Sequence, residues 1–126
     1  MERVVLVGTS TPMQRLLLAA ADVEGVALCG LFTERATPTE VTRLAAARGL
    51  PTFDIEGLRG EAGLRELVDL RPDWLFSVNS TVILPPAALA VPTRGALNMH
   101  PGKLPEYAGL HTPQWALRNG EASCGV

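Results

Sequence analysis

Cysteine and aromatic residues are scarce in this chain. Phe, Trp and Tyr make up 5% of its 126 residues, and its two cysteines are Cys29 and Cys124. The two thiols lie far apart in the sequence and neither belongs to a C-x-x-C pair, so a zinc or redox site has little support and no metal is expected. With few aromatic rings to bury, the core must be built from aliphatic side chains, and Cys29 is interpreted as a small core residue.

Long apolar runs and an excess of one charge are also missing. No stretch reaches the roughly 20 apolar residues that a membrane helix needs, and the first residues, MERVVLVGTS, do not resemble a secretory signal. The formal net charge of -2 offers no basic surface for DNA or RNA. We therefore expect a cytoplasmic protein with neither a membrane nor a nucleic-acid partner.

The chain does have the composition of one globular domain over residues 1–126, with 47% hydrophobic and 19% charged residues. Apolar, β-branched runs predict strands over 3–8, 26–32, 50–55, 74–78 and 96–99. Capping signals and helical periodicity predict helices over 13–21, 40–48, 61–70, 85–90 and 112–119. This alternation predicts an α/β fold, a doubly wound and mostly parallel sheet with helices on both faces.

Two further segments lie at the ends of that alternation. Gly8-Thr9-Ser10-Thr11-Pro12 joins a strand to a helix but lacks the later glycines of a dinucleotide fingerprint, so it is interpreted as a tight turn rather than a phosphate site. Ser123-Cys124-Gly125-Val126 is predicted to begin another strand. A domain that stops on a new strand is expected to be incomplete at its C-terminal end.

The most informative residues come where the strand over 96–99 ends. Side chains at positions i and i+2 of a strand share a face, so Asn98 and His100 are predicted to project together. Leu97 and Met99 are predicted to point the other way, into helices. Ligands of open parallel sheets bind outside the carboxyl ends of the strands, which makes this amide and imidazole candidates for polarising a substrate. Taken alone, however, an Asn-x-His triplet is more often structural.

The residues after this triplet extend it into a longer motif. Asn98-Met99-His100-Pro101 is followed by Leu104-Pro105, Tyr107-x-Gly109, Gln114-Trp115, Asn119-Gly120-Glu121 and Gly125-Val126. This combination resembles the 10-formyltetrahydrofolate-dependent formyltransferase family. The order of the preceding strands also agrees with the family's N-terminal Rossmann-like catalytic domain, so the resemblance covers the chain, strongly after Ser77 and only generically before it.

The resemblance implies catalytic roles for Asn98 and His100. In the family these positions flank the formyl group of 10-formyltetrahydrofolate, the implied donor, which an amine attacks through a tetrahedral intermediate. Asn98 would donate a hydrogen bond to the developing oxyanion, and a protonated His100 would add another or pass a proton.

The family's pterin-binding loop matches residues 77–84 of this chain. From composition alone this loop is more simply a strand-to-helix connection. The resemblance instead assigns folate contacts to five positions, Ser77, Val82, Ile83, Leu84 and Leu89.

The chain departs from the family pattern in two places. Gly102-Lys103 stands where a Ser-Leu pair is common, which puts contacts of that serine hydroxyl in doubt. The family also carries an Asp about 30 to 40 residues after its His, where it orients the imidazole and assists proton removal. That position lies beyond Val126, so the segment alone is expected to be inactive or very slow.

The acceptor is predicted to be a small-molecule or carrier-bound amine. The segment from Tyr107 to Ala116 looks closer to family members acting on amino sugars or carrier-bound amino acids, and the low charge offers no platform for tRNA. His111 is interpreted as a substrate-side or loop residue, and other domains of a larger polypeptide are candidate partners. Two alternatives stay open, a folate-binding pseudoenzyme that lacks the Asp and an unrelated nucleotide-binding Rossmann-like domain.

Overall fold

Five parallel strands form one sheet in the computed structural model, which describes residues 1–20 and 22–126. The strands are β1 (Glu2–Val7), β2 (Val26–Thr33), β3 (Thr52–Asp54), β4 (Trp74–Val78) and β5 (Gly95–Met99). They lie in the order β3-β2-β1-β4-β5, and every neighbouring pair is parallel. The prediction of an α/β fold with a parallel sheet is confirmed.

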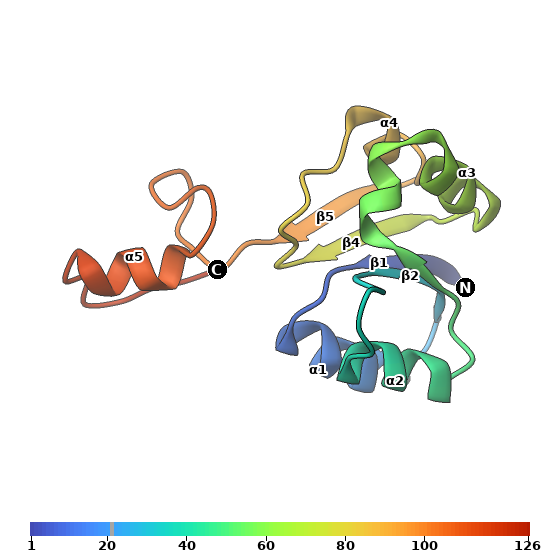
Figure 1. Ribbon diagram of the computed structural model, residues 1–126, viewed down its shortest axis with the longest axis horizontal. Helices are drawn as coiled ribbons and strands as arrows, with labels where there is room; N and C mark the ends of the chain where they lie inside the picture. Colours follow the sequence, from blue (N-terminus) through green and yellow to red (C-terminus); the bar gives the residue numbers. More distant parts are fainter. Residues whose placement is uncertain (21) are drawn as a thin grey trace.

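Helices cover both faces of this sheet (Figure 1). Helices α1 (Thr11–Ala20) and α2 (Glu40–Ala47) lie side by side on one face, and the 3₁₀ helix η1 (Ile55–Arg59), α3 (Glu61–Asp69) and α4 (Pro86–Leu89) lie on the other. A last helix, α5 (Thr112–Arg118), follows β5 and lies apart from both layers. The predicted helix boundaries agree within two residues, except that the predicted end of the first helix, Ala21, lies outside the described residues.

Both faces of the sheet are buried, because successive side chains along a strand belong alternately to two apolar clusters. In β1, Val5 and Val7 belong to the cluster beneath α3 and α4, whereas Leu6 belongs to the cluster beneath α1 and α2. Each of these three side chains is at most 1% exposed. Full burial of a side chain of this size stabilises a fold by roughly 1.5–3 kcal/mol, so the central strand is strongly held between the two helix layers.

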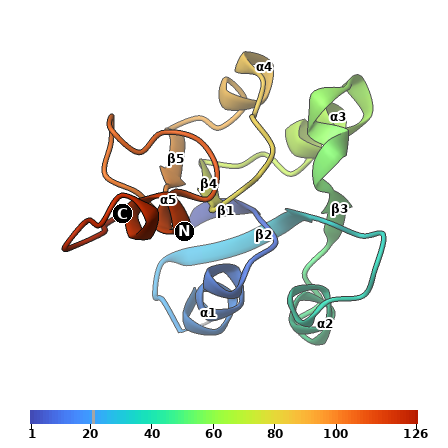
Figure 2. The same ribbon diagram turned by 60° about the vertical axis from the view of Figure 1, so that its left-hand side comes forward.

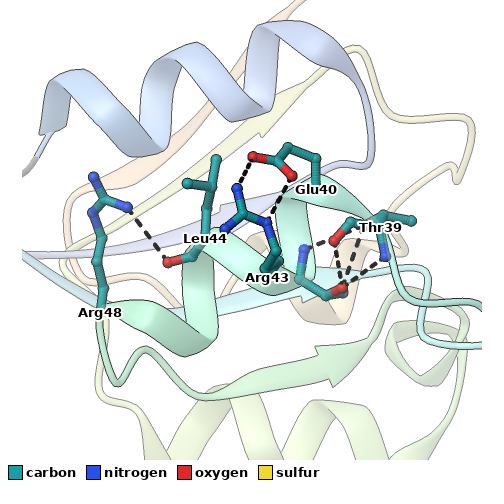
Figure 3. Close-up of polar contacts among 6 residues, drawn as sticks. Thr39, Glu40, Arg43, Leu44 and Arg48 are labelled. Atoms are coloured by element: carbon teal, nitrogen blue, oxygen red, sulfur yellow. Dashed lines mark hydrogen bonds and ion pairs between the residues drawn. The ribbon is translucent and has the colours of Figure 1, made fainter.

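The start of α2 shows how the local sequence sets a helix boundary. The Thr39 hydroxyl accepts a hydrogen bond from the Thr42 amide at 3.2 Å, and the Thr42 hydroxyl accepts one from the Thr39 amide at 2.8 Å. Figure 3 shows this cap beside the Glu40–Arg43 ion pair on the first turn. The two reciprocal bonds satisfy amides that the helix itself leaves unpaired, which is why the helix begins at Glu40.

Three local predictions are wrong. The strand predicted over 50–55 is limited to Thr52–Asp54, because the Asp54 carboxylate accepts the Glu56 amide at 3.1 Å and begins η1 at the next residue. Residues 123–126 form no strand, since none of the described strands pairs with them. Leu97 does not pack into helices and is 54% exposed, because β5 is an edge strand that the cluster beneath α1 and α2 reaches only at Met99.

The amino ends of three strands are tied together by Asp73. Its carboxylate accepts the Arg3 amide at 2.8 Å and the Thr93 hydroxyl at 2.9 Å. The hydrogen bond from the Arg3 backbone is the main reason that the pKa of Asp73 lies below its usual value, and the bond from Thr93 is the second. This polar tie lies at the opposite end of the strands from Asn98 and His100.

None of the described helices is long and apolar enough to cross a membrane.

Candidate functional site

The chain changes its direction of travel across the sheet between β1 and β4. Strands β1, β2 and β3 move step by step to one edge, whereas β4 and β5 move to the other. The loops that leave the carboxyl ends of β1 and β4 therefore diverge, and ligands of such sheets bind in the crevice between them. Asn98 lies at the carboxyl end of β5 and His100 directly after it, so both residues are at this edge. Figure 2 shows the segment that follows β5 and leads to α5.

A polar cavity of about 350 Å³ occupies this crevice. Four segments build its walls, and they contribute Thr9 and Ser10, residues 79–81, residues 98–101 and residues 109–111 with 113–114. The predicted catalytic pair is brought together here, with Asn98 exposed and His100 half-buried. The cavity thus collects hydroxyl, amide and imidazole groups from segments that are distant in the sequence.

A second, apolar cavity of about 610 Å³ opens over β4 and β5 beside α4. All five residues predicted to bind the folate line it, namely Ser77, Val82, Ile83, Leu84 and Leu89. Ser77 and Val82 are 5% and 6% exposed, whereas Ile83 is 87% exposed, so the first two form the floor and Ile83 the rim. Cavities that hold drug-sized ligands measure about 300–1,000 Å³, and the apolar walls suit a flat heterocycle.

The polar and apolar cavities meet at Asn98, which lines both. Ser77 is the register partner of Asn98 in the β4–β5 pair, so the two side chains lie on the same face of the sheet. Ser80 also lines both cavities, and its hydroxyl accepts the Val82 amide at 3.1 Å, which tightens the intervening loop. A group held in one cavity and a group held in the other therefore both come within reach of the Asn98 amide.

The backbone of the following loop holds His100. Its Nε2 contacts the carbonyl oxygen of Tyr107, and because a carbonyl can only accept, Nε2 carries the proton of this hydrogen bond. The Tyr107 amide donates to the Lys103 carbonyl at 2.7 Å, and the Thr112 hydroxyl donates to the Pro101 carbonyl. The segment after β5 therefore folds back on His100 and restrains its ring.

Sequence reasoning missed several residues of the polar cavity. The interpretation of Gly8 to Pro12 as a plain turn overlooks Thr9 and Ser10, which line the cavity. Ser10 Oγ is buried and has no hydrogen-bond partner in the described part of the chain, so an unsatisfied hydroxyl lies in the cavity wall. His111, interpreted as a substrate-side or loop residue, lines the same cavity. The signal that could have found Thr9 and Ser10 is their position after the first strand of a doubly wound sheet.

Neither the cysteines nor the carboxylates form a second site. Within residues 1–20 and 22–126, no group of three His, Cys, Asp or Glu side chains is placed to hold a metal ion. Cys29 packs against the apolar cluster beneath α3 and α4, as predicted for a core residue, and burial raises the pKa of its thiol. Cys124 is exposed.

Comparison with known proteins identifies related sequences. A family model described as "Formyl transferase" matches residues 2–126. Methionyl-tRNA formyltransferase of Xylella fastidiosa (strain 9a5c) is 37% identical over 136 residues, which cover 98% of this chain and 43% of the relative. Methionyl-tRNA formyltransferase of Stenotrophomonas maltophilia (strain R551-3) is 40% identical over 89 residues, which cover 71% of this chain and 29% of the relative. The chain thus spans less than half the length of these curated relatives.

Solved structures share the fold. Phosphoribosylglycinamide formyltransferase from Brucella melitensis has a TM-score of 0.73 at 28% identity, covering 94% of this chain and 67% of that one. Glycinamide ribonucleotide transformylase 1 from Geobacillus kaustophilus has a TM-score of 0.78 at 24% identity, covering 95% and 69%. The family model matches nearly every residue and the Rossmann-like architecture is the same, so this chain belongs to the formyl transferase family.

Proposed function

We propose that residues 1–126 contribute an N-terminal catalytic domain to a protein that transfers a formyl group from 10-formyltetrahydrofolate to an amine. The observation that carries the proposal is the place of Asn98, which lines both the apolar cavity and the polar cavity. A donor in one cavity and an acceptor in the other can react only where the cavities meet. Asn98 is the polar side chain of β5 at that meeting point.

The apolar cavity suits the pterin end of the donor. Val82, Leu84 and Leu89 provide apolar walls for a flat heterocycle, and the family resemblance implies that the main chain of the loop over 77–84 pairs with its edge donors and acceptors. When bound there, the donor supplies an electrophilic formyl carbon. Its formyl group would need to lie near Asn98, where the apolar cavity opens into the polar one.

Asn98 and His100 have different roles in the formyl transfer. Negative charge develops on the formyl oxygen as the amine attacks, and an amide N–H of Asn98 stabilises that charge by a hydrogen bond. Such donors typically contribute a rate factor of about 100 to 1,000. His100, held by the Tyr107 carbonyl, is the group of the pair that can move a proton. Neither residue forms a covalent bond with the formyl group.

The acceptor is proposed to be a small-molecule or carrier-bound amine, such as an amino sugar or a carrier-bound amino acid. Among the described residues, those that line the polar cavity include no lysine or arginine. A phosphate-rich acceptor such as tRNA is usually held by basic side chains. The curated relatives carry the name methionyl-tRNA formyltransferase, so the exclusion of a nucleic-acid partner stays a prediction and the assay must include methionyl-tRNA.

The experiment compares the Asn98→Ala variant with the unchanged protein, both prepared at the length that the native cell produces. Formyl transfer from 10-formyltetrahydrofolate is measured with methionyl-tRNA, glycinamide ribonucleotide and an amino-sugar nucleotide as acceptors. We expect transfer to one acceptor, a fall in kcat of about 100-fold to 1,000-fold in the variant, and donor affinity within about threefold of the unchanged protein. Full transfer by Asn98→Ala would refute the proposed mechanism.

Donor binding is tested separately on the wall of the apolar cavity. Leu89→Asp places a carboxylate at a half-exposed wall position, and Val68→Asp makes the same change on α3 at similar exposure, 54% against 45%. We expect Leu89→Asp to weaken binding of the formyl-folate at least about tenfold, because a charge facing an apolar ligand is desolvated without a partner. The Val68→Asp control should bind normally. Binding without transfer to any acceptor would favour the pseudoenzyme alternative.

A further inference from the structure

Tyr107 connects His100 to the far end of α5. Its backbone carbonyl accepts the hydrogen bond of His100 Nε2. Its phenol hydroxyl donates to Glu121 Oε1 at 2.9 Å and accepts from Asn119 Nδ2 at 3.3 Å. The carbonyl that holds the imidazole therefore belongs to a residue whose side chain is itself anchored at two points.

Gly102 gives the Tyr107 carbonyl the room to approach. A Cβ at position 102 would lie 2.9 Å from the Tyr107 carbonyl oxygen and 2.9 Å from Thr112 Oγ1. Contacts this close force one of the atoms to move, and the Tyr107 carbonyl is backbone that already accepts the His100 hydrogen bond. Gly102 is also the position where the sequence departs from the Ser-Leu-Leu-Pro pattern common in the family. The lack of a side chain at position 102 therefore explains how the Tyr107 carbonyl can lie so close to this part of the backbone.

We propose that Tyr107 is a positioning residue that fixes the ring of His100 with the proton on Nε2. A neutral imidazole protonated on Nε2 has its lone pair on Nδ1, so Nδ1 is the atom that exchanges protons with the reactants. In the transfer, the acceptor nitrogen first adds to the formyl carbon to give the tetrahedral intermediate, and the bond from that carbon to the folate nitrogen then breaks. His100 Nδ1 takes the proton that the amine loses and returns it to the departing folate nitrogen. The catalytic meaning of this step rests on the proposed function, whereas the hydrogen bond does not.

The hydrogen bond is tested by nitrogen NMR of the histidine rings in the unliganded chain. The chain has two histidines, and His111→Gln assigns their signals. At a pH where imidazole is neutral, we expect His100 to be almost wholly in the form protonated on Nε2, with that proton protected from exchange with water. His111 should show the mixture of forms typical of an exposed ring. A mixed and unprotected His100 would overturn the proposal.

Three variants separate positioning from general damage to the loop. Gly102→Ser should displace the Tyr107 carbonyl and remove the protected Nε2 proton signal. Tyr107→Phe keeps the aromatic ring but loses the phenol hydrogen bonds to Glu121 and Asn119. This variant should speed exchange of the His100 Nε2 proton at least about tenfold. It keeps the test decisive if Gly102→Ser does not fold. Lys103→Ala, which removes the exposed side-chain hydrogen bond to Ser123 and keeps the Lys103 carbonyl that accepts the Tyr107 amide, is the control and should leave His100 unchanged. Unaltered His100 signals in both Gly102→Ser and Tyr107→Phe would refute the role of Tyr107.

Activity then links this role to the chemistry. In the protein that transfers formyl groups, Tyr107→Phe should lower kcat with little change in KM. Glu121→Ala should also lower kcat. Glu121→Gln keeps an oxygen acceptor for the phenol, so it should retain most of the rate that Glu121→Ala loses. A protected His100 proton in a protein that transfers to no acceptor would sink the proposed function and leave the positioning role intact. Normal kcat in Tyr107→Phe with an altered His100 ring would overturn the catalytic meaning of Tyr107 alone.

Discussion

Substitution of Gly8 by alanine should destabilise the fold beside the candidate site. Gly8 follows β1 with a φ of +152°, and its amide donates to the Phe32 carbonyl at 3.0 Å. A Cβ there would lie 2.4 Å from the Val78 carbonyl oxygen, at the end of β4. Strain at such a φ costs about 1–3 kcal/mol and overpacking against fixed neighbours about 1–3 kcal/mol. We expect a loss of about 2–6 kcal/mol, or roughly 8–24 °C in Tm for a domain of this size.

The assay is thermal and urea unfolding followed by circular dichroism, with Gly25→Ala as the matched control. Gly25 also has a positive φ, +81°, but a Cβ at this position meets nothing within 4 Å. The control therefore carries the backbone strain without the contact, and it should lose only about 1–2 kcal/mol. Equal losses of unfolding free energy in Gly8→Ala and Gly25→Ala would refute the reasoning, because they would show that the close approach of the Val78 carbonyl to Gly8 adds no cost.

Two other perturbations test the packing and the charges of the fold. Gly63→Ala should destabilise the protein by up to about 2 kcal/mol, because the new Cβ would lie 2.2 Å from the Gly57 carbonyl carbon and overpacking of about 1–3 kcal/mol exceeds the gain of about 1 kcal/mol from helix propensity. Ala62→Gly on the exposed side of the same helix should lose about 1 kcal/mol, and a stabilised Gly63→Ala would contradict the close contact. For Asp73, whose pKa the Arg3 amide lowers, the carboxylate stabilises the fold above its unfolded pKa of about 3.9, and this contribution is lost as the pH falls through the lower folded value. The stability difference between the unchanged protein and Asp73→Asn should therefore be largest near neutral pH and shrink in acid, and urea titrations that give the same difference at every pH would exclude this role.

The sequence was sufficient for most of the elements and for the choice of Asn98 and His100 as candidate residues. Strands and helices have periods of two and about 3.6 residues, which are visible in any short window, and the Thr39 cap is equally local. Asn98 and His100 could be chosen because their motif is continuous in the chain. The errors fall where the outcome depends on a neighbour. Leu97 looks like a core residue in its strand, yet its strand lies at an edge of the sheet, and residues 123–126 have strand composition but no strand beside them.

By itself the sequence determined the alternation of strands and helices, the family and the identity of the candidate catalytic pair, because each is a property of continuous segments. The tertiary structure alone decided that the five residues predicted to contact the folate line one cavity, that Thr9 and Ser10 share another with His100, and that the two cavities meet at Asn98. It also decided that a backbone carbonyl holds the His100 ring. These features depend on strand order, register and the path of a loop, which are set by packing between segments that are far apart in the chain.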